Sequence, residues 1–205
     1  GLRDTALATS SMVCVDGVLY LAVQDLCKAK FGIFDEAPAA SIYKSTDKGR
    51  TWTGTSEPMF KDYVFTTIMF LDYGKDNGNS PDGYVYAYGL DYNWRDSFSG
   101  RVTDPTNLYL ARVPGNSVQD RSKWEFFSGT AGSPSWSRDV GARKPVLSDS
   151  RRVYEYVTEG MSGVRDMTVL SQGSIVYNKA LNRYIYTSWT EYTYEFYESP
   201  TPYGP

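Results

Sequence analysis

The sequence predicts an all-β protein, and three observations lead to this prediction. Aromatic residues make up 16% of the 205-residue chain, and such residues are more common in strands than in helices. Short aromatic and β-branched runs separated by turn residues dominate the chain, whereas the apolar spacing of amphipathic helices is nearly absent. The strand pattern also recurs at long intervals. We therefore expect antiparallel sheets, with a helix content below about 10%.

A hairpin is expected over residues 12–23, because Asp16-Gly17 between two apolar runs favours a type I′ turn. The register of this hairpin places Cys27 opposite Ala6 and not opposite Cys14. A disulfide between the two cysteines would then require the chain to fold back after about residue 24.

The strand pattern of this hairpin returns twice. Residues 18–23 are matched by residues 84–89 at an offset of 66, and Leu19-Tyr20-Leu21 by Tyr184-Ile185-Tyr186 at an offset of 165. Trp52 is matched by Trp124 at an offset of 72. A basic residue followed by Asp opens each repeated unit, at Arg3-Asp4, Lys61-Asp62 and Arg165-Asp166.

Units of about four short strands, repeated at this length, are typical of the blades of a β-propeller. We assign blades to approximately residues 1–55, 59–130 and 163–205, with an insertion at 131–162. Residues 1–205 are then part of one propeller domain and hold about two and a half to three blades. Because propellers have at least four blades, we expect a further segment, missing from this chain, to complete the ring. A plain β-sandwich is the alternative fold.

Composition excludes several classes of function. The chain has no His, which excludes Ser-His-Asp triads, Cys-His dyads and His-ligated metals. A net charge of −3 argues against nucleic acid as a partner, and no apolar run approaches the length of a membrane span. No metal motif is present: Lys75 interrupts the acidic run that begins at Asp72, and the Glu that ends a calcium loop is absent. No cofactor is expected, although calcium is left open.

Residues 45–52, Ser-Thr-Asp-Lys-Gly-Arg-Thr-Trp, fit the pattern Ser-x-Asp-x-Gly-x-Thr-Trp. They resemble the Asp-box of sialidases and other propeller proteins. In this pattern the Asp carboxylate can bind turn amides, Gly supplies a positive φ, and Trp is expected to pack between sheets. The resemblance implies a turn between a third and a fourth strand, away from the substrate funnel.

A wider resemblance extends through most of residues 1–199. It is carried by the segments at 84–91, 108–114, 174–178 and 181–184. Together they resemble five-bladed propeller domains related to glycoside hydrolases, some of which cleave D-arabinan. The resemblance implies a furanoside or another polysaccharide as substrate. The chain departs from that family because whole blades are missing.

Strand direction suggests where a site would lie. If the turn at Asp47 marks one end of the blades, the loops that enter each first strand lie at the other end. Glycoside hydrolysis needs one protonated acid and one ionised base or nucleophile. We favour Asp62 as the ionised group, because the adjacent Lys61 can keep it charged. Asp4 or Asp166 would be the other carboxylate or a modulator of its pKa, and Glu159 the acid.

Basic, acidic and aromatic side chains at the same end are expected to contact the sugar: Arg3, Lys61, Asp91, Trp94, Arg95, Arg143 and Arg165. The alternative for the repeated Asp residues is structural, since an Asp at the start of a strand often binds backbone amides.

These observations predict a secreted, extracellular, carbohydrate-active propeller, a glycoside hydrolase that acts on a polysaccharide through paired carboxylates. A non-catalytic glycan-binding module and a protein-interaction propeller are the alternatives, because a fold does not determine a function. The expected partners are a glycan or polysaccharide and the remaining propeller segment.

Overall fold

The computed structural model describes residues 5–28, 34–92, 103–153, 168–190 and 193–204. Strands account for 52% and helices for 7% of the structure, so the prediction of an all-β protein with antiparallel sheets and little helix is confirmed. The helices in the described ranges are 3₁₀ turns of three residues each, at Lys75–Asn77, Gly115–Ser117, Arg121–Lys123 and Val140–Ala142. Among the described residues, no helix is long and apolar enough to span a membrane.

The first sheet contains β1 (Thr5–Val15), β2 (Val18–Lys28) and β3 (Phe34–Ser45) in that order. Asp16 and Gly17 have φ angles of 50° and 76°, as the expected type I′ turn requires. The pairing slips by one residue between Thr9 and Ser11, so Cys27 lies opposite Thr5. The expected partner, Ala6, is therefore wrong by one position because of this β-bulge. Cys14 and Cys27 are both free thiols.

After the turn at Asp47 the chain returns along β3. Isolated bridges join Lys44 to Thr53 and Ala40 to Phe60, with backbone N–H···O distances of 2.9 to 3.0 Å. The place of a fourth strand in the first sheet is therefore taken by two bridges.

The other strands form a second, larger sheet, whose order is β12-β11-β10-β4-β5-β6-β7-β8 with β9 paired to β6. Its first part comprises β4 (Thr67–Asp72), β5 (Tyr84–Leu90), β6 (Asn107–Pro114), β7 (Glu125–Phe127), β8 (Trp136–Ser137) and β9 (Pro145–Ser148). Its second part comprises β10 (Gly173–Asn178), β11 (Arg183–Thr190) and β12 (Thr193–Ser199). We call these parts the middle group and the third group. A short parallel pairing of β10 with β4 joins them.

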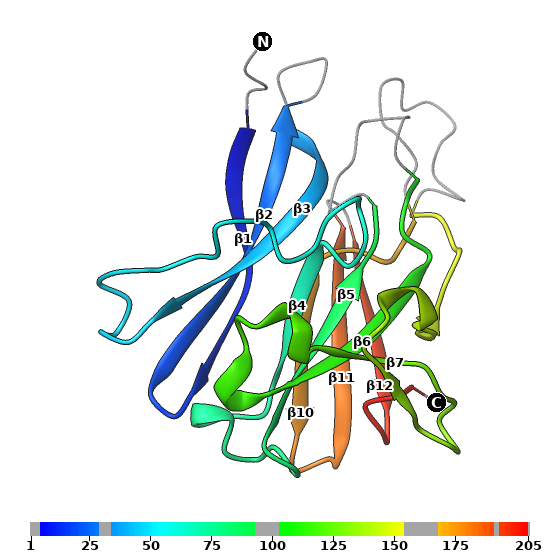
Figure 1. The fold of residues 1–205 in the computed structure, drawn as a ribbon. Helices are drawn as coiled ribbons and strands as arrows, with labels where there is room; N and C mark the ends of the chain where they lie inside the picture. The colour runs from blue at the N-terminus through cyan, green and yellow to red at the C-terminus, as the bar shows by residue number, and fades with distance from the viewer. Residues whose placement is uncertain (1–4, 29–33, 93–102, 154–167, 191–192, 205) are drawn as a thin grey trace.

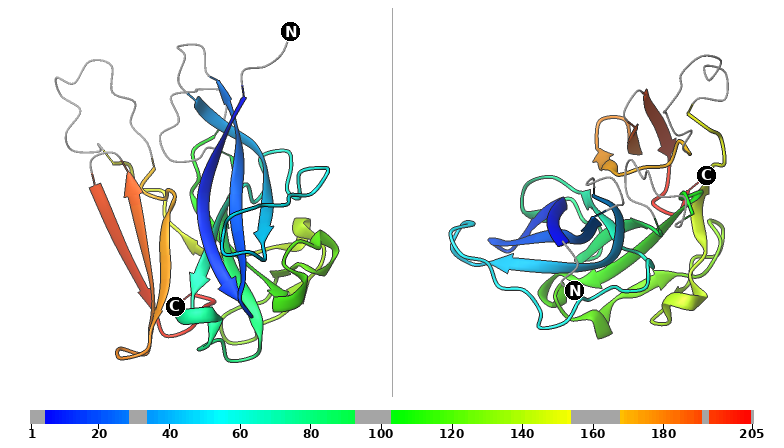
Figure 2. Two further views of the ribbon diagram at one scale, coloured as in Figure 1. Left: turned by 90° about the vertical axis from the view of Figure 1, so that its left-hand side faces the viewer. Right: turned by 90° about the horizontal axis from the view of Figure 1, so that it is seen from above.

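The predicted offsets correspond to equivalent strands. The second strands of the three groups, β2, β5 and β11, begin at residues 18, 84 and 183. The first strands, β1, β4 and β10, lie side by side (Figures 1 and 2): the Phe70 amide donates to Ser11 Oγ at 2.9 Å, and the Gln172 amide group donates to the Ser10 carbonyl at 3.4 Å. Within the described ranges the strands do not close into a ring.

Two hydrophobic cores fill the spaces between the three groups. The core between the first sheet and the middle group is centred on Trp124, which is fully buried and makes edge-to-face contacts with Phe60 and Phe65. Trp52, the expected inter-sheet residue, is only half-buried and donates from Nε1 to the Gly49 carbonyl of its own turn at 3.1 Å. The expectation that Trp52 packs between sheets is therefore wrong, and Trp124 has that position.

The turn at Asp47 has the hydrogen bonds that its residue types suggest. Asp47 accepts from the Thr51 amide at 2.9 Å and from the Thr51 hydroxyl at 2.6 Å. The Ser45 hydroxyl accepts from the Gly49 amide at 2.8 Å, and Gly49 has a φ of 84°. The hydrogen bonds from Thr51 and Ser45 lower the pKa of Asp47 from its ordinary value of 3.8 to about 2.

Trp124→Ala should lower the free energy of unfolding by about 3–5 kcal/mol, because it empties a fully buried site among aromatic rings. Trp52→Ala should cost less than about 2 kcal/mol, since Trp52 is only half-buried and belongs to neither core. Urea denaturation followed by circular dichroism would measure both. Equal losses for the two variants would contradict this assignment of the inter-sheet residue.

The Asp47 turn should make stability depend on acid pH. Because folding lowers the pKa of Asp47, its ionised form stabilises the protein fully above about pH 4, and this contribution is lost as the pH falls through about 2. The urea midpoint of the natural protein should therefore fall more steeply between pH 4 and pH 2 than that of Asp47→Asn. Parallel slopes for the two proteins would show that the carboxylate does not contribute in this way.

Candidate functional site

Different turns and loops lie at the two ends of the strands. At one end the Asp76 carboxylate accepts a hydrogen bond from the Gly17 amide at 3.0 Å, so the first turns of the first sheet and the middle group meet. Ser45 lies opposite Leu19 in β2, which places the Asp47 turn at this end too. We call it the turn end.

The opposite end, which we call the loop end, is where β5 ends at Leu90 and β6 begins at Asn107. Residues 53–60 run along β3 away from the turn end, as their bridges to β3 show. Lys61-Asp62 follow this segment and therefore lie at the loop end.

Four of the predicted site residues lie in the described part of the chain: Lys61, Asp62, Asp91 and Arg143. The others lie outside the described residues: the candidate catalytic residues Asp4, Glu159 and Asp166, and the candidate substrate-binding residues Arg3, Trp94, Arg95 and Arg165.

Asp62 is an exposed carboxylate on an unusual turn. Its φ is 58°, and Tyr63 and Phe65 also have positive φ values of 62° and 56°. Bulky residues rarely adopt this left-handed conformation, and such strain is common at functional sites. Lys61, expected to support Asp62, instead forms an exposed ion pair with Glu57 at 3.0 Å.

At the loop end the buried Asp91 forms an ion pair with the half-buried Arg143. Asp91 Oδ1 accepts from the Phe65 amide at 2.7 Å, and Oδ2 accepts from the Arg143 guanidinium. Arg143 also donates to the Val140 carbonyl at 2.7 Å and lies 4.5 Å above the centre of the Tyr109 ring. Both oxygens of Asp91 are therefore occupied by donors from the protein itself.

Two further arginines, from the segment that leads away from β9, also bind carboxylates. Arg152 pairs with the buried Asp104 at 3.3 Å, and Arg151 pairs with Asp149 at 2.7 Å. Sequence reasoning missed both pairs. The clustering of arginines at positions 138–152 was the available signal, but it does not reveal which carboxylates the arginines meet.

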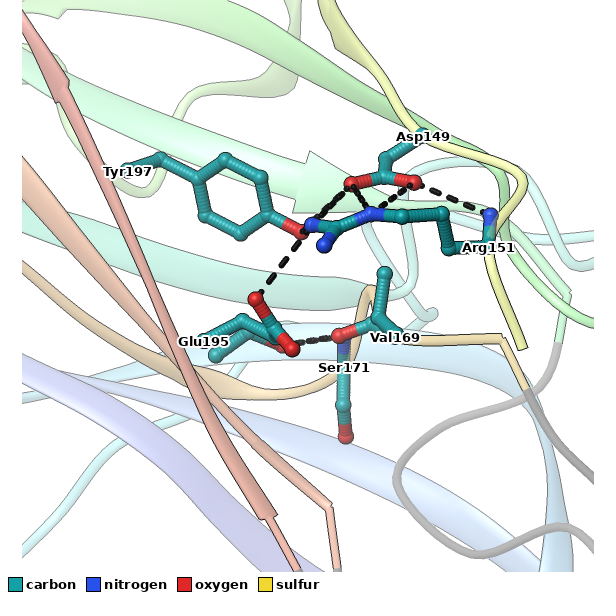
Figure 3. A network of polar contacts seen from close by, with 7 residues as sticks. Asp149, Arg151, Val169, Ser171, Glu195 and Tyr197 are labelled. Carbon is teal, nitrogen blue, oxygen red and sulfur yellow. Dashed lines mark hydrogen bonds and ion pairs between the residues drawn. The ribbon is translucent and has the colours of Figure 1, made fainter. Parts of the chain in front are cut away.

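The Asp149 pair belongs to a network that links the middle group to β12 (Figure 3). Asp149 accepts from Nε, NH2 and the backbone amide of Arg151, and from the Tyr197 hydroxyl at 2.9 Å. The same Arg151 NH2 lies 3.3 Å from Glu195. One guanidinium nitrogen of Arg151 therefore contacts a carboxylate next to the middle group and a carboxylate of β12.

The charges in this network determine which chemistry it can support. Burial tends to raise the pKa of Asp149, but hydrogen bonds from Arg151 and Tyr197 outweigh burial and lower it. Burial and the bond to Asp149 raise the pKa of Tyr197 well above its usual range. Asp149 is thus held ionised and is unsuited to donate a proton. The arrangement is suited to linking the third group to the middle group at the loop end.

Within the described part of the chain, no three Cys, Asp or Glu side chains are grouped so that they could hold a metal ion.

Comparison with known proteins gives similarity of fold. No family model and no curated protein matches the chain. It is similar to a structure from Bacteroides ovatus described as a "putative hydrolase", with a TM-score of 0.51 and 12% identity, over 99% of this chain and 44% of that one. It is also matched to the GH43_1 enzyme from Xanthomonas citri complexed with xylose, with a TM-score of 0.36 and 13% identity, over 99% of this chain and 74% of that one. The chain thus spans less than half the length of the Bacteroides structure, with which it shares a fold.

Proposed function

We propose that this chain is part of a β-propeller hydrolase that cleaves a polysaccharide at the loop end. The observation that carries the proposal is the exposed Asp62 carboxylate, which a strained left-handed turn presents at that end. Two findings support it: three strand groups lie side by side along their first strands, and the fold resembles that of the Bacteroides structure described as a "putative hydrolase". The Asp-box-like sequence at residues 45–52 points to the same class of protein.

In this proposal Asp62 is the ionised base or nucleophile. Asp4 or Asp166 supplies the second carboxylate or modulates its pKa, and Glu159 protonates the leaving oxygen. Trp94 offers an aromatic face for a sugar ring. Four basic side chains bind sugar hydroxyls: Arg3, Lys61, Arg95 and Arg165. Because structural polysaccharides such as arabinan lie outside cells, we also propose that the protein is extracellular.

The proposal also includes further blades that cover the two outer sheet faces. Leu7 and Met12 in β1 are 64% and 57% exposed, and Tyr194 and Phe196 in β12 are 61% and 71% exposed. Large apolar side chains so exposed along a strand mark a surface that another element covers. The natural occupants are further sheets of the same propeller, each with an apolar face of its own.

Asp62→Asn should reduce hydrolysis by at least about a hundredfold, the usual effect of removing an acid–base group. Asn is compatible with the left-handed conformation, so the turn should be retained. Release of reducing sugar from a panel of polysaccharides that includes arabinan would measure the effect. Asp16→Asn is the matched control, because Asp16 is also exposed and left-handed but lies at the turn end. Undiminished hydrolysis by folded Asp62→Asn would refute the catalytic role, and glycan binding without hydrolysis would favour a binding module.

The uncovered faces should bind an apolar fluorescent dye when the chain is studied alone. Met12→Lys and Phe196→Lys should each reduce the dye fluorescence and leave the thermal midpoint nearly unchanged, because both side chains are exposed. Dye binding that is absent from the natural chain, or unaffected by both substitutions, would argue against docking faces for further blades.

A further inference from the structure

We propose that Asp91 and Arg143 are positioning residues that hold the Asp62 turn in its left-handed conformation. The role of this turn in catalysis rests on the function proposed above, whereas the support given to the turn rests on contacts alone. Asp91 was expected to bind substrate, but with both oxygens occupied it acts on the backbone of the turn instead.

The turn needs external support because of its backbone. Three of the four residues from Asp62 to Phe65 have positive φ values, and none of them is glycine. Such residues keep this conformation only where the surrounding structure enforces it. Within the turn, the Val64 amide donates to the Lys61 carbonyl at 3.1 Å, which does not by itself determine the other residues.

The end of β5 provides most of the support. The Asp91 carboxylate accepts from the Phe65 amide at 2.7 Å, and the Tyr92 amide donates to the Tyr63 carbonyl at 2.7 Å. Gly89 is also required, because a Cβ atom there would lie 2.4 Å from the Phe65 ring. Residues 89–92 therefore hold the backbone of the turn through hydrogen bonds and leave space for the Phe65 ring.

The first sheet holds the turn from the other side. The Tyr63 amide donates to the Pro38 carbonyl at 3.1 Å, and the Tyr63 hydroxyl donates to Glu36 at 3.0 Å. Asp62 itself is left exposed to solvent between these anchored neighbours. The turn thus presents one carboxylate at a junction between two sheets.

Arg143 determines how Asp91 is oriented. Its guanidinium binds Asp91, donates to the Val140 carbonyl and stacks on Tyr109, so it is fixed at three points. A buried carboxylate held by a fixed guanidinium has one favoured orientation, and here that orientation directs its second oxygen to Phe65. The segment at 140–143 is thereby coupled to the geometry of Asp62.

Amide hydrogen exchange of Phe65 tests this role without any substrate. Asp91→Ala should accelerate exchange of the Phe65 amide at least about tenfold, because the acceptor is lost. Asp91→Asn should accelerate exchange less, since an amide oxygen can still accept the hydrogen bond. Arg143→Met should also accelerate exchange, although it leaves the Asp91 carboxylate itself unchanged. Asp104→Ala is the matched control: it removes another buried carboxylate that pairs with an arginine, Arg152, and should leave Phe65 unaffected.

The outcomes separate this inference from the proposed function. Unchanged Phe65 exchange in folded Asp91→Asn, Asp91→Ala and Arg143→Met would overturn the positioning role, whatever the hydrolysis assay shows. Faster exchange together with a lower kcat and an unchanged KM would support it as a device for catalysis. If exchange is faster in these variants but the natural protein hydrolyses no polysaccharide, Asp91 and Arg143 still hold the turn, and the proposed function is refuted.

Discussion

The three strand groups meet along β1, β4 and β10, and side-chain packing, more than a continuous ladder of backbone hydrogen bonds, holds them together. The first sheet is separate from the rest, and only two residue pairs join β10 to β4. Apolar burial is not directional, so rings such as Trp124 and Phe65 must fit by shape. This packing fixes the relative placement of the sheets, and with it the placement of every loop at the loop end.

The loop end uses charge in a consistent way. Asp91, Asp104 and Asp149 each meet an arginine from the segment at 143–152. A buried carboxylate is costly unless it is paired and hydrogen-bonded, so these arginines allow carboxylates to lie between sheets. Asp62 differs from them because it is exposed and has no arginine partner among the described residues. That contrast separates the groups that hold the structure from the group that we propose reacts.

The same packing accounts for the exposed apolar faces. The middle group is covered on both sides by its neighbours, and its first two strands, β4 and β5, are buried almost throughout. The first and third groups each have one covered face and one face with large exposed side chains, including Leu7 and Phe196. Their asymmetry is what a row of stacked sheets produces at its two outer members. The proposal of further blades is based on this asymmetry.

Local structure could be predicted from the sequence because it depends on near neighbours. The Asp16-Gly17 turn, the low helix content and the equivalence of β2, β5 and β11 follow from turn chemistry, side-chain alternation and a repeated pattern. The one-residue slip near Ser11 could not be predicted, since a bulge depends on how the strand meets its neighbours.

Side-chain partners were decided by the tertiary structure. Lys61 is adjacent to Asp62 in sequence, yet it pairs with Glu57, because consecutive side chains point in different directions. Asp91 meets Arg143 across 52 positions, and Trp124 takes the inter-sheet place expected of Trp52. The sequence by itself determined which segments become strands and turns. Only the packing of the sheets decided which carboxylates are buried and paired and which remain exposed, because both depend on contacts between residues far apart in the chain.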